Sequence, residues 1–133
     1  MSTESDAAQI WLRYARSDLA VARTEFGSAE VLPETLCFHA QQAVEKAIKA
    51  VLTAHAVEIP RSHNIGELLD LIPRGIARDQ KVENSAILTD YGVSARYPGE
   101  AEPLGSADVA AAADLAEAAV RWAEAAVAAT PGS

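Results

Sequence analysis

The sequence predicts an all-α protein, an up-and-down antiparallel bundle of four to five helices. Apolar residues recur at three- and four-residue steps over long segments without Gly or Pro, which is the spacing of an amphipathic helix. No segment shows a persuasive alternation of apolar and polar residues bounded by hairpin turns. The 133 residues contain no internal repeat, so we expect one domain over residues 1–133 with an ordered core at about 6–129.

Two helices are expected in the first half of the chain. The first begins at a cap formed by Ser5 or Asp6 and stops at residues 27–28. Its apolar positions are Trp11, Tyr14, Ala15, Leu19, Ala22 and Phe26. The second is the most regular segment and covers about 34–55, with Pro33 suited to its first turn. Its apolar series is Leu36, Ala40, Ala43, Val44, Ala47, Ile48 and Val51.

Three further helices are expected in the second half. A short helix over 65–72 ends near Pro73, and a fourth helix starts between positions 77 and 81. Residues 92–105 hold three glycines and two prolines, which predicts a long loop, and long loops are often functional. An Ala-rich helix runs from Ser106 until Pro131 ends it, and Asp108 and Asp114 favour its positive end.

Charge and composition exclude several classes of function. Eleven Lys and Arg residues against nineteen Asp and Glu residues give a net charge of -8, which disfavours non-specific attraction to nucleic acid or an anionic membrane. No apolar run reaches the length of about eighteen residues that spans a bilayer. The N-terminus lacks the features of a signal peptide, and the single cysteine, Cys37, cannot form an intramolecular disulfide. We therefore expect a cytoplasmic protein that does not span a membrane.

The expected second helix holds the densest group of polar residues. Gln42, Glu45, Lys46 and Lys49 are three or four residues apart and share a broad face. One interpretation is a solvated stripe with a Glu45–Lys49 pair worth about 0.2–0.5 kcal/mol. The other is an interface or anion-binding surface, in which the two lysines supply charge to a phosphate and Gln42 supplies an uncharged donor and acceptor.

A second polar cluster lies in the expected long loop. Arg96 offers a planar fork of donors and Tyr97 offers a ring and a hydroxyl, a pair that can recognise a nucleotide. Equally, Tyr97 and Pro98 can fold the loop onto the bundle while Arg96 pairs with a carboxylate.

The remaining reactive side chains favour structural roles. The three histidines have neither paired helical spacing nor a cysteine cluster, so we expect no metal. His63 precedes the third helix, where packing or hydrogen bonding is its ordinary role, and His39 on the second helix is ambiguous. Cys37 stands beside apolar residues as an inert buried thiol. Without a phosphate loop or a nucleophile elbow, no cofactor and no catalytic residue is expected.

Taken in order along the chain, a series of short motifs resembles the HEPN family (higher eukaryotes and prokaryotes nucleotide-binding), in its small stand-alone prokaryotic type. The matching segments are Trp11, Ala15 and Asp18-Leu19, the run from Phe38 to Leu52, Ile59-Pro60, Ser62-His63-Asn64-Ile65, Leu68-Leu69, and Ala95-Arg96-Tyr97-Pro98. Any one piece is a weak signal, whereas the ordered series with these gaps is fairly specific.

The resemblance implies a homodimeric helical bundle that works beside a separately encoded minimal nucleotidyltransferase, frequently as a toxin–antitoxin pair. It also implies a nucleotide, RNA or other phosphate ligand. The candidate binding residues are Gln42, Glu45, Lys46, Lys49, His63, Arg96 and Tyr97. A metal-independent endoribonuclease toxin, with His63 as base and Arg96 as cation, is the alternative, and a structural interaction module is the third. Ribonucleases of the family space their Arg and His more widely than Arg61 and His63, so no catalytic residue is carried over.

Overall fold

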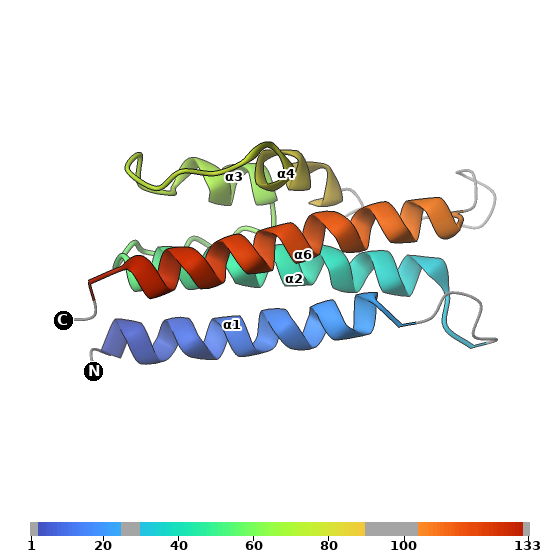
Figure 1. Cartoon of the computed structure of the whole chain (residues 1–133), viewed down its shortest axis with the longest axis horizontal. Helices are drawn as coiled ribbons and strands as arrows, with labels where there is room; N and C mark the ends of the chain where they lie inside the picture. The colour runs from blue at the N-terminus through green and yellow to red at the C-terminus, as the bar shows by residue number, and fades with distance from the viewer. Residues whose placement is uncertain (1–2, 25–29, 90–103, 132–133) are drawn as a thin grey trace.

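The computed structural model describes residues 3–24, 30–89 and 104–131. Within these ranges the chain forms helices and no strand, so the expected all-α class is confirmed. The elements are α1 (Thr3–Ala22), α2 (Pro33–Ala54), α3 (Ile65–Asp70), α4 (Gln80–Asn84), the 3-10 helix η1 (Ser85–Leu88) and α6 (Ser106–Ala129). Figure 1 shows α1, α2 and α6 side by side along the long axis, with α3 and α4 on the side away from α1.

Contacts between side chains show in which direction each of the three long helices runs relative to the others. Asp18, near the end of α1, contacts His39 near the beginning of α2, whereas Trp11 contacts Lys49 further along α2. An ion pair from Arg16 of α1 and another from Arg23, just after α1, join residues of α6 in the same antiparallel order. Therefore α2 and α6 run in the same direction, and the chain between them returns along the bundle through α3 and α4 (Figure 1).

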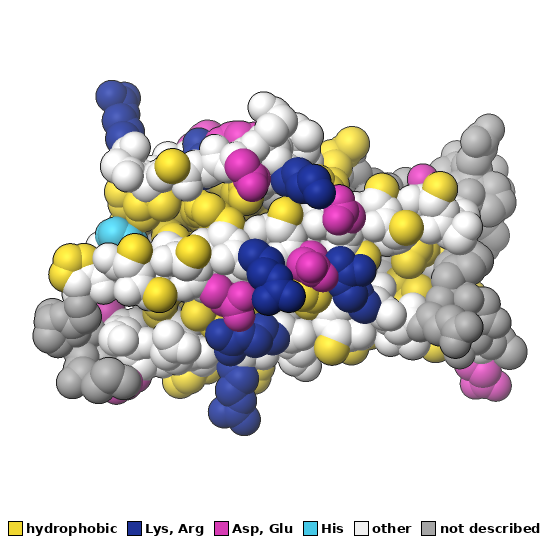
Figure 2. All heavy atoms as spheres, viewed as in Figure 1, with side chains coloured by type: hydrophobic (Ala, Val, Ile, Leu, Met, Phe, Trp, Pro, Cys, Tyr) yellow, Lys and Arg dark blue, Asp and Glu magenta, His cyan; other side chains and the backbone are white. Residues whose placement is uncertain are grey.

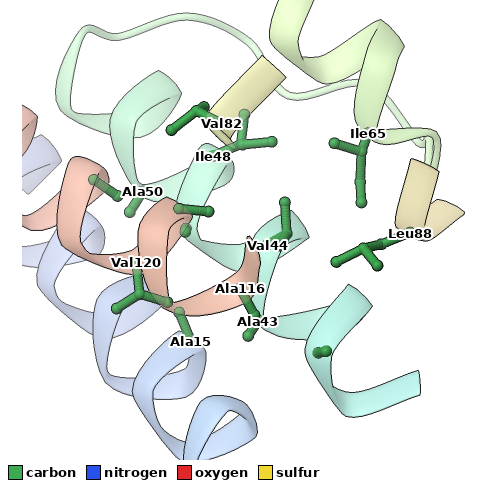
Figure 3. Packing of buried hydrophobic residues seen from close by; sticks show 14 of the residues in the cluster. Ala15, Ala43, Val44, Ile48, Ala50, Ile65, Val82, Leu88, Ala116 and Val120 are labelled. Atoms are coloured by element: carbon green, nitrogen blue, oxygen red, sulfur yellow. The ribbon is translucent and has the colours of Figure 1, made fainter. Parts of the chain in front are cut away.

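Small side chains fill the space where the long helices meet. Figure 3 shows Ala15, Ala43, Ala116 and Val120 gathered where α1, α2 and α6 come together. Alanine lets helix axes approach closely and supports helix formation at the same time. Larger buried side chains pack between α2 and the elements α3, α4 and η1. They are Val44, Ile48, Leu52, Ile65, Leu68, Val82 and Leu88.

The boundaries of α1 differ from the expected ones. The helix begins at Thr3, so the cap expected at Ser5 or Asp6 is wrong, and both residues lie inside the helix. In the first turn the Asp6 carboxylate is near the positive end of the helix dipole, where it is favourable. The helix ends at Ala22 in a turn closed by a short-range hydrogen bond, before the expected apolar position Phe26. The stop expected after that position lies outside the described residues.

The central helices follow the sequence more closely. α2 begins at Pro33, whose fixed φ suits a first turn, and ends one residue before the expected boundary. The side chain of Asn64 caps α3 by accepting the Glu67 N–H at 3.0 Å. The expected fourth helix is divided into α4 and η1 at Ser85, whose hydroxyl donates to the Val82 carbonyl and competes with the α-helical ladder.

The Ala-rich helix α6 is confirmed from Ser106 to Ala129. At its start the Asp108 carboxylate accepts the Gly105 N–H at 2.8 Å. The helix-end role expected for Asp114 is wrong, because this residue lies beyond the first turns and accepts from Lys81 of α4 at 2.8 Å. No helix in the three described ranges has both the length and the apolar character that a membrane span requires. Of the expected long loop, only residues 104–105 are described.

Candidate functional site

The middle of α2 is nearly enclosed, and its partly exposed side chains form one row. Phe38 and the adjacent His39 reach solvent, and Gln42, Lys46 and Lys49 follow them at three- and four-residue steps, whereas the residues between them are buried. We call these five residues the α2 stripe. Besides a glutamate in the first turn, α2 has one carboxylate, and it lies buried beneath this stripe.

That carboxylate belongs to Glu45, which is 2% exposed and gathers three donors. Its Oε1 accepts from Gln41 Nε2, while its Oε2 lies 3.4 Å from Lys49 Nζ and 3.0 Å from His63 Nδ1. Removing a carboxylate from water is costly unless donors replace the solvent, and here they do. Because His63 comes from the connection before α3, Glu45 also ties this connection to the middle of α2.

Asp18 provides a second carboxylate of the same kind from α1. Its Oδ1 lies 2.8 Å from His39 Nδ1, and its Oδ2 lies 2.5 Å from Lys46 Nζ. About two helical turns before Asp18 on α1, the ring of Trp11 lies under the ammonium group of Lys49, 5.5 Å from the ring centroid, a cation–π contact. Each buried carboxylate therefore holds one histidine and one lysine.

Most donors of this network are more exposed to solvent than its carboxylates, although Lys49 is only 12% exposed. The side chains of Asp18 and Glu45 are 12% and 2% exposed, whereas Lys46 is 26% and His63 is 74% exposed. Each lysine has N–H groups beyond the one that its carboxylate accepts, and Gln42 adds an amide group. Donors arranged in this way can bind an oxyanion such as phosphate through charge-assisted hydrogen bonds.

The surface between α1 and α6 has a different arrangement of charge. Figure 2 shows Lys and Arg side chains close to Asp and Glu side chains over these two helices. Arg16 pairs with Glu124 at 2.7 Å, Arg23 pairs with Glu117 at 2.5 Å, and Arg121 lies near both glutamates. These carboxylates are about one-third exposed, so they neutralise the arginines at the surface itself.

Two hollows on the described part of the surface lie away from the α2 stripe, and no stripe residue lines either of them. One, of about 470 Å³, lies between η1 and α6 beside Ile87 and Leu115. The other, of about 370 Å³, lies at the ends of α2 and α6 beside His55 and Trp122. Across the described ranges, no group of three His, Cys, Asp or Glu residues could hold a metal ion.

The structure places most of the predicted binding residues in one network: Gln42, Glu45, Lys46, Lys49 and His63. Gln42 Nε2 donates to the Gln41 side-chain carbonyl at 2.9 Å, and this links it to the buried carboxylate. The interpretation of the Glu45–Lys49 pair as solvated is wrong, because the side chain of Lys49 is only 12% exposed and Glu45 is buried. Arg96 and Tyr97, the other two predicted binding residues, lie outside the described residues, so their part in the site stays a prediction.

Sequence reasoning missed the role of Asp18 and Gln41 and left His39 undecided. A signal for Asp18 was present, because it follows Ala15 by three residues and precedes Ala22 by four, and therefore shares the apolar face of α1. Gln41 similarly occupies a position on the enclosed side of α2. A polar side chain at such a position needs a buried partner, which indicates a network before its members are known.

Comparisons with known proteins identify relatives that match most of the chain. The family model described as the HEPN domain matches residues 8–127. The crystal structure of TT1696 from Thermus thermophilus is 30% identical in sequence, with 90% of this chain and 97% of that chain covered and a TM-score of 0.76. The crystal structure of ST0689, an archaeal HEPN homologue, is 24% identical, with the same coverage and a TM-score of 0.70. Among curated proteins, no match was found.

Proposed function

The chain belongs to the HEPN domain family, and we propose that it is a homodimeric module that binds a nucleotide or other phosphate ligand on the α2 stripe. We further propose that it acts together with a separately encoded minimal nucleotidyltransferase, as one half of a toxin–antitoxin pair. Ligand binding rests on one observation: Gln42, Lys46, Lys49 and His63 present donors above two buried carboxylates. Family membership supports the dimer and the partner.

Because the net charge of the protein is negative, it can attract an anionic ligand only over a short distance from the α2 stripe. The net charge of -8 repels an anionic ligand at a distance. Beyond the Debye length of about 8 Å at physiological ionic strength this repulsion is screened, so local donors decide the affinity. Because the carboxylate of Asp18 is less exposed than Lys46, a ligand meets the ammonium group of Lys46 first. We therefore expect affinity to fall as salt is added.

Calorimetric titration with ADP tests the ligand site. Lys46→Met and Gln42→Leu should each weaken ADP binding, by about tenfold for the lysine, because a hydrogen bond to a charged group is lost. Lys81→Met is the matched control, since this lysine is 56% exposed on α4 and pairs with the exposed Asp114. Equal affinity in all three variants, or no ADP binding by the wild-type protein, would contradict the ligand site.

Co-expression tests whether the protein forms a complex with the proposed nucleotidyltransferase. The chain and a minimal nucleotidyltransferase from the same genome should elute as one complex from a sizing column, with the light-scattering mass of both proteins. Separate elution at micromolar concentration would remove the nucleotidyltransferase from the proposal and leave the ligand site standing.

The alternative activity, metal-independent RNA cleavage, requires a base and a cation at one phosphodiester. Glu45 holds His63 in place through Nδ1, but the proposed cation Arg96 lies outside the described residues. No observation in the described ranges favours this alternative over ligand binding, and we do not propose it.

A further inference from the structure

Asp18 holds the imidazole of His39 in a defined orientation on the α2 stripe. The two oxygens of this carboxylate have different partners, with Oδ1 at His39 Nδ1 and Oδ2 at Lys46 Nζ. An ionised carboxylate only accepts hydrogen bonds, so the Nδ1 that faces it carries a hydrogen. The other ring nitrogen, Nε2, is then the atom at which His39 gains or loses its proton.

Protonation at Nε2 decides what His39 offers to an anion. The neutral ring presents a lone pair at Nε2, which cannot donate to a phosphate oxygen, whereas the protonated ring presents an N–H donor and a positive charge. Lys46 neutralises Asp18, so the net charge of the three side chains equals that of the imidazole. The His39 side chain is 31% exposed, more than the Asp18 carboxylate that holds it.

Among the described residues, the charged groups that face His39 come from α1 and α2. From α1 the facing charge is Asp18, and from α2 it is Lys46, which reaches the same carboxylate. The ring of Phe38 meets the imidazole edge to face, with centroids 5.7 Å apart. Among the described residues, no ion pair joins His39 to α3, α4 or α6. The second histidine beside the stripe, His63, lies on a separate carboxylate.

We propose that His39, positioned by Asp18, is a proton-dependent contact for an oxyanion on the α2 stripe. The proposal rests on the proposed phosphate site and adds a residue and a form of regulation to it. As the pH falls and His39 becomes protonated, the site gains one donor and one positive charge beside Lys46. Binding of a doubly charged oxyanion is therefore tighter in mildly acidic than in mildly alkaline solution.

Sulfate is a suitable probe, because its charge does not change between about pH 5 and pH 8, where histidine titrates. The titration is followed by NMR in His63→Gln, so that His39 is the only histidine at the stripe. We expect this variant to bind sulfate on the order of tenfold more tightly at about pH 5.5 than at about pH 8. The double variant His63→Gln with His39→Gln should bind with equal affinity at both pH values. A pH effect that survives in the double variant, or that is absent from His63→Gln, overturns the proposal.

The positioning role of Asp18 has its own readout. Nitrogen NMR of the neutral imidazole should show His39 as the Nδ1–H tautomer in the wild-type protein. Asp18→Asn keeps the size of the side chain but adds a donor, so we expect a mixture of tautomers and a smaller pH effect on sulfate binding. An unchanged tautomer and pH effect would reject the role of Asp18. Amide signals of α6 report whether each variant is folded.

The two levels of the proposal fail in different ways. If the wild-type protein binds ADP in a Lys46-dependent manner but the His39 substitution leaves the pH effect intact, only the role of His39 is rejected. If the wild-type protein binds neither ADP nor sulfate at either pH, the phosphate site itself is rejected together with it.

Discussion

Two carboxylates, Asp18 and Glu45, organise the polar side chains around α2. Each accepts from one histidine and one lysine, so the lysines remain fixed at the surface instead of moving freely in solvent. Fixed donors lose less conformational freedom when a ligand arrives than flexible ones do. For ligand binding, the buried carboxylates therefore matter as much as the histidines and lysines that they hold.

The substitution Glu45→Ala tests whether the network around this carboxylate stabilises the fold. The substitution leaves Lys49 and Gln41 without their buried acceptor, and we expect a loss of about 3–5 kcal/mol in the free energy of unfolding. Glu45→Gln keeps an acceptor and should cost less. Glu117→Ala is the control, because Glu117 is 36% exposed. Urea denaturation measures all three, and a Glu45→Ala loss no larger than that of the control would show that the network does not stabilise the fold.

The sequence could reveal only part of this network. The spacing of Gln42, Lys46 and Lys49 shows that they share one face of a helix, because that follows from helical geometry alone. The contacts of Asp18 and His63 could not be inferred in the same way. They depend on the rotation of α1 about its axis and on the path of the connection before α3, which packing of the whole chain determines.

At the scale of the element, α6 shows how close packing constrains a helix. Ala116 is fully buried where α6 meets the other long helices, whereas Ala125 on the same helix is exposed (Figure 3). Ala116→Leu should lower the free energy of unfolding by about 1–3 kcal/mol through overpacking. Ala125→Leu should change it by less than about 0.5 kcal/mol. Chemical denaturation distinguishes the two, and equal effects would contradict the close contact.

The Lys81–Asp114 pair links α4 to α6 and gives a pH-dependent contribution. The hydrogen bond from Lys81, together with its charge, holds the pKa of Asp114 below the ordinary 3.8, and the same bond raises the pKa of Lys81 above 10.5. The stabilisation from Asp114 is therefore complete above pH 3.8 and is lost as the pH falls below it. The contribution of Lys81 is complete below pH 10.5 and is lost as the pH rises through the raised pKa.

We accordingly expect Asp114→Asn to weaken the dependence of stability on pH in the acid range below 3.8, by a small amount because both side chains are more than half exposed. Thermal unfolding across the acid range measures the difference. An acid transition identical to that of the wild-type protein would show that the pair is not maintained in solution.

The elements were predictable to different degrees. The length of α2 follows from an uninterrupted apolar series with Pro33 at its start, both of which are local properties. The early end of α1 and the division at Ser85 were not predictable from apolar spacing. In both places, short-range hydrogen bonds replace the α-helical ladder while the apolar pattern continues.

At the scale of the whole molecule, the helical class and the family could be predicted, because the apolar spacing and the ordered motifs extend along most of the chain. The directions of the helices follow from the contacts of α1 with α2 and α6. The binding role of Arg96 and Tyr97 stays a prediction, since both residues lie outside the described ranges.

At the scale of the whole molecule we predict that the protein forms a homodimer. A small helical bundle buries a limited fraction of its surface, and pairing with a second copy is a common way to bury more. We expect light scattering to give the mass of a dimer at micromolar concentration. A monomeric mass at every concentration up to the limit of solubility would exclude the homodimer.

The central claim, that the α2 stripe is the anion-binding face, is tested most directly by amide NMR during a titration with ADP. The account predicts saturable shifts concentrated at residues 38–49 and His63, with little change along α6. Saturable shifts centred instead on Arg16, Arg23 and Arg121, where surface carboxylates already neutralise the arginines, would contradict it, as would the absence of any saturable shift.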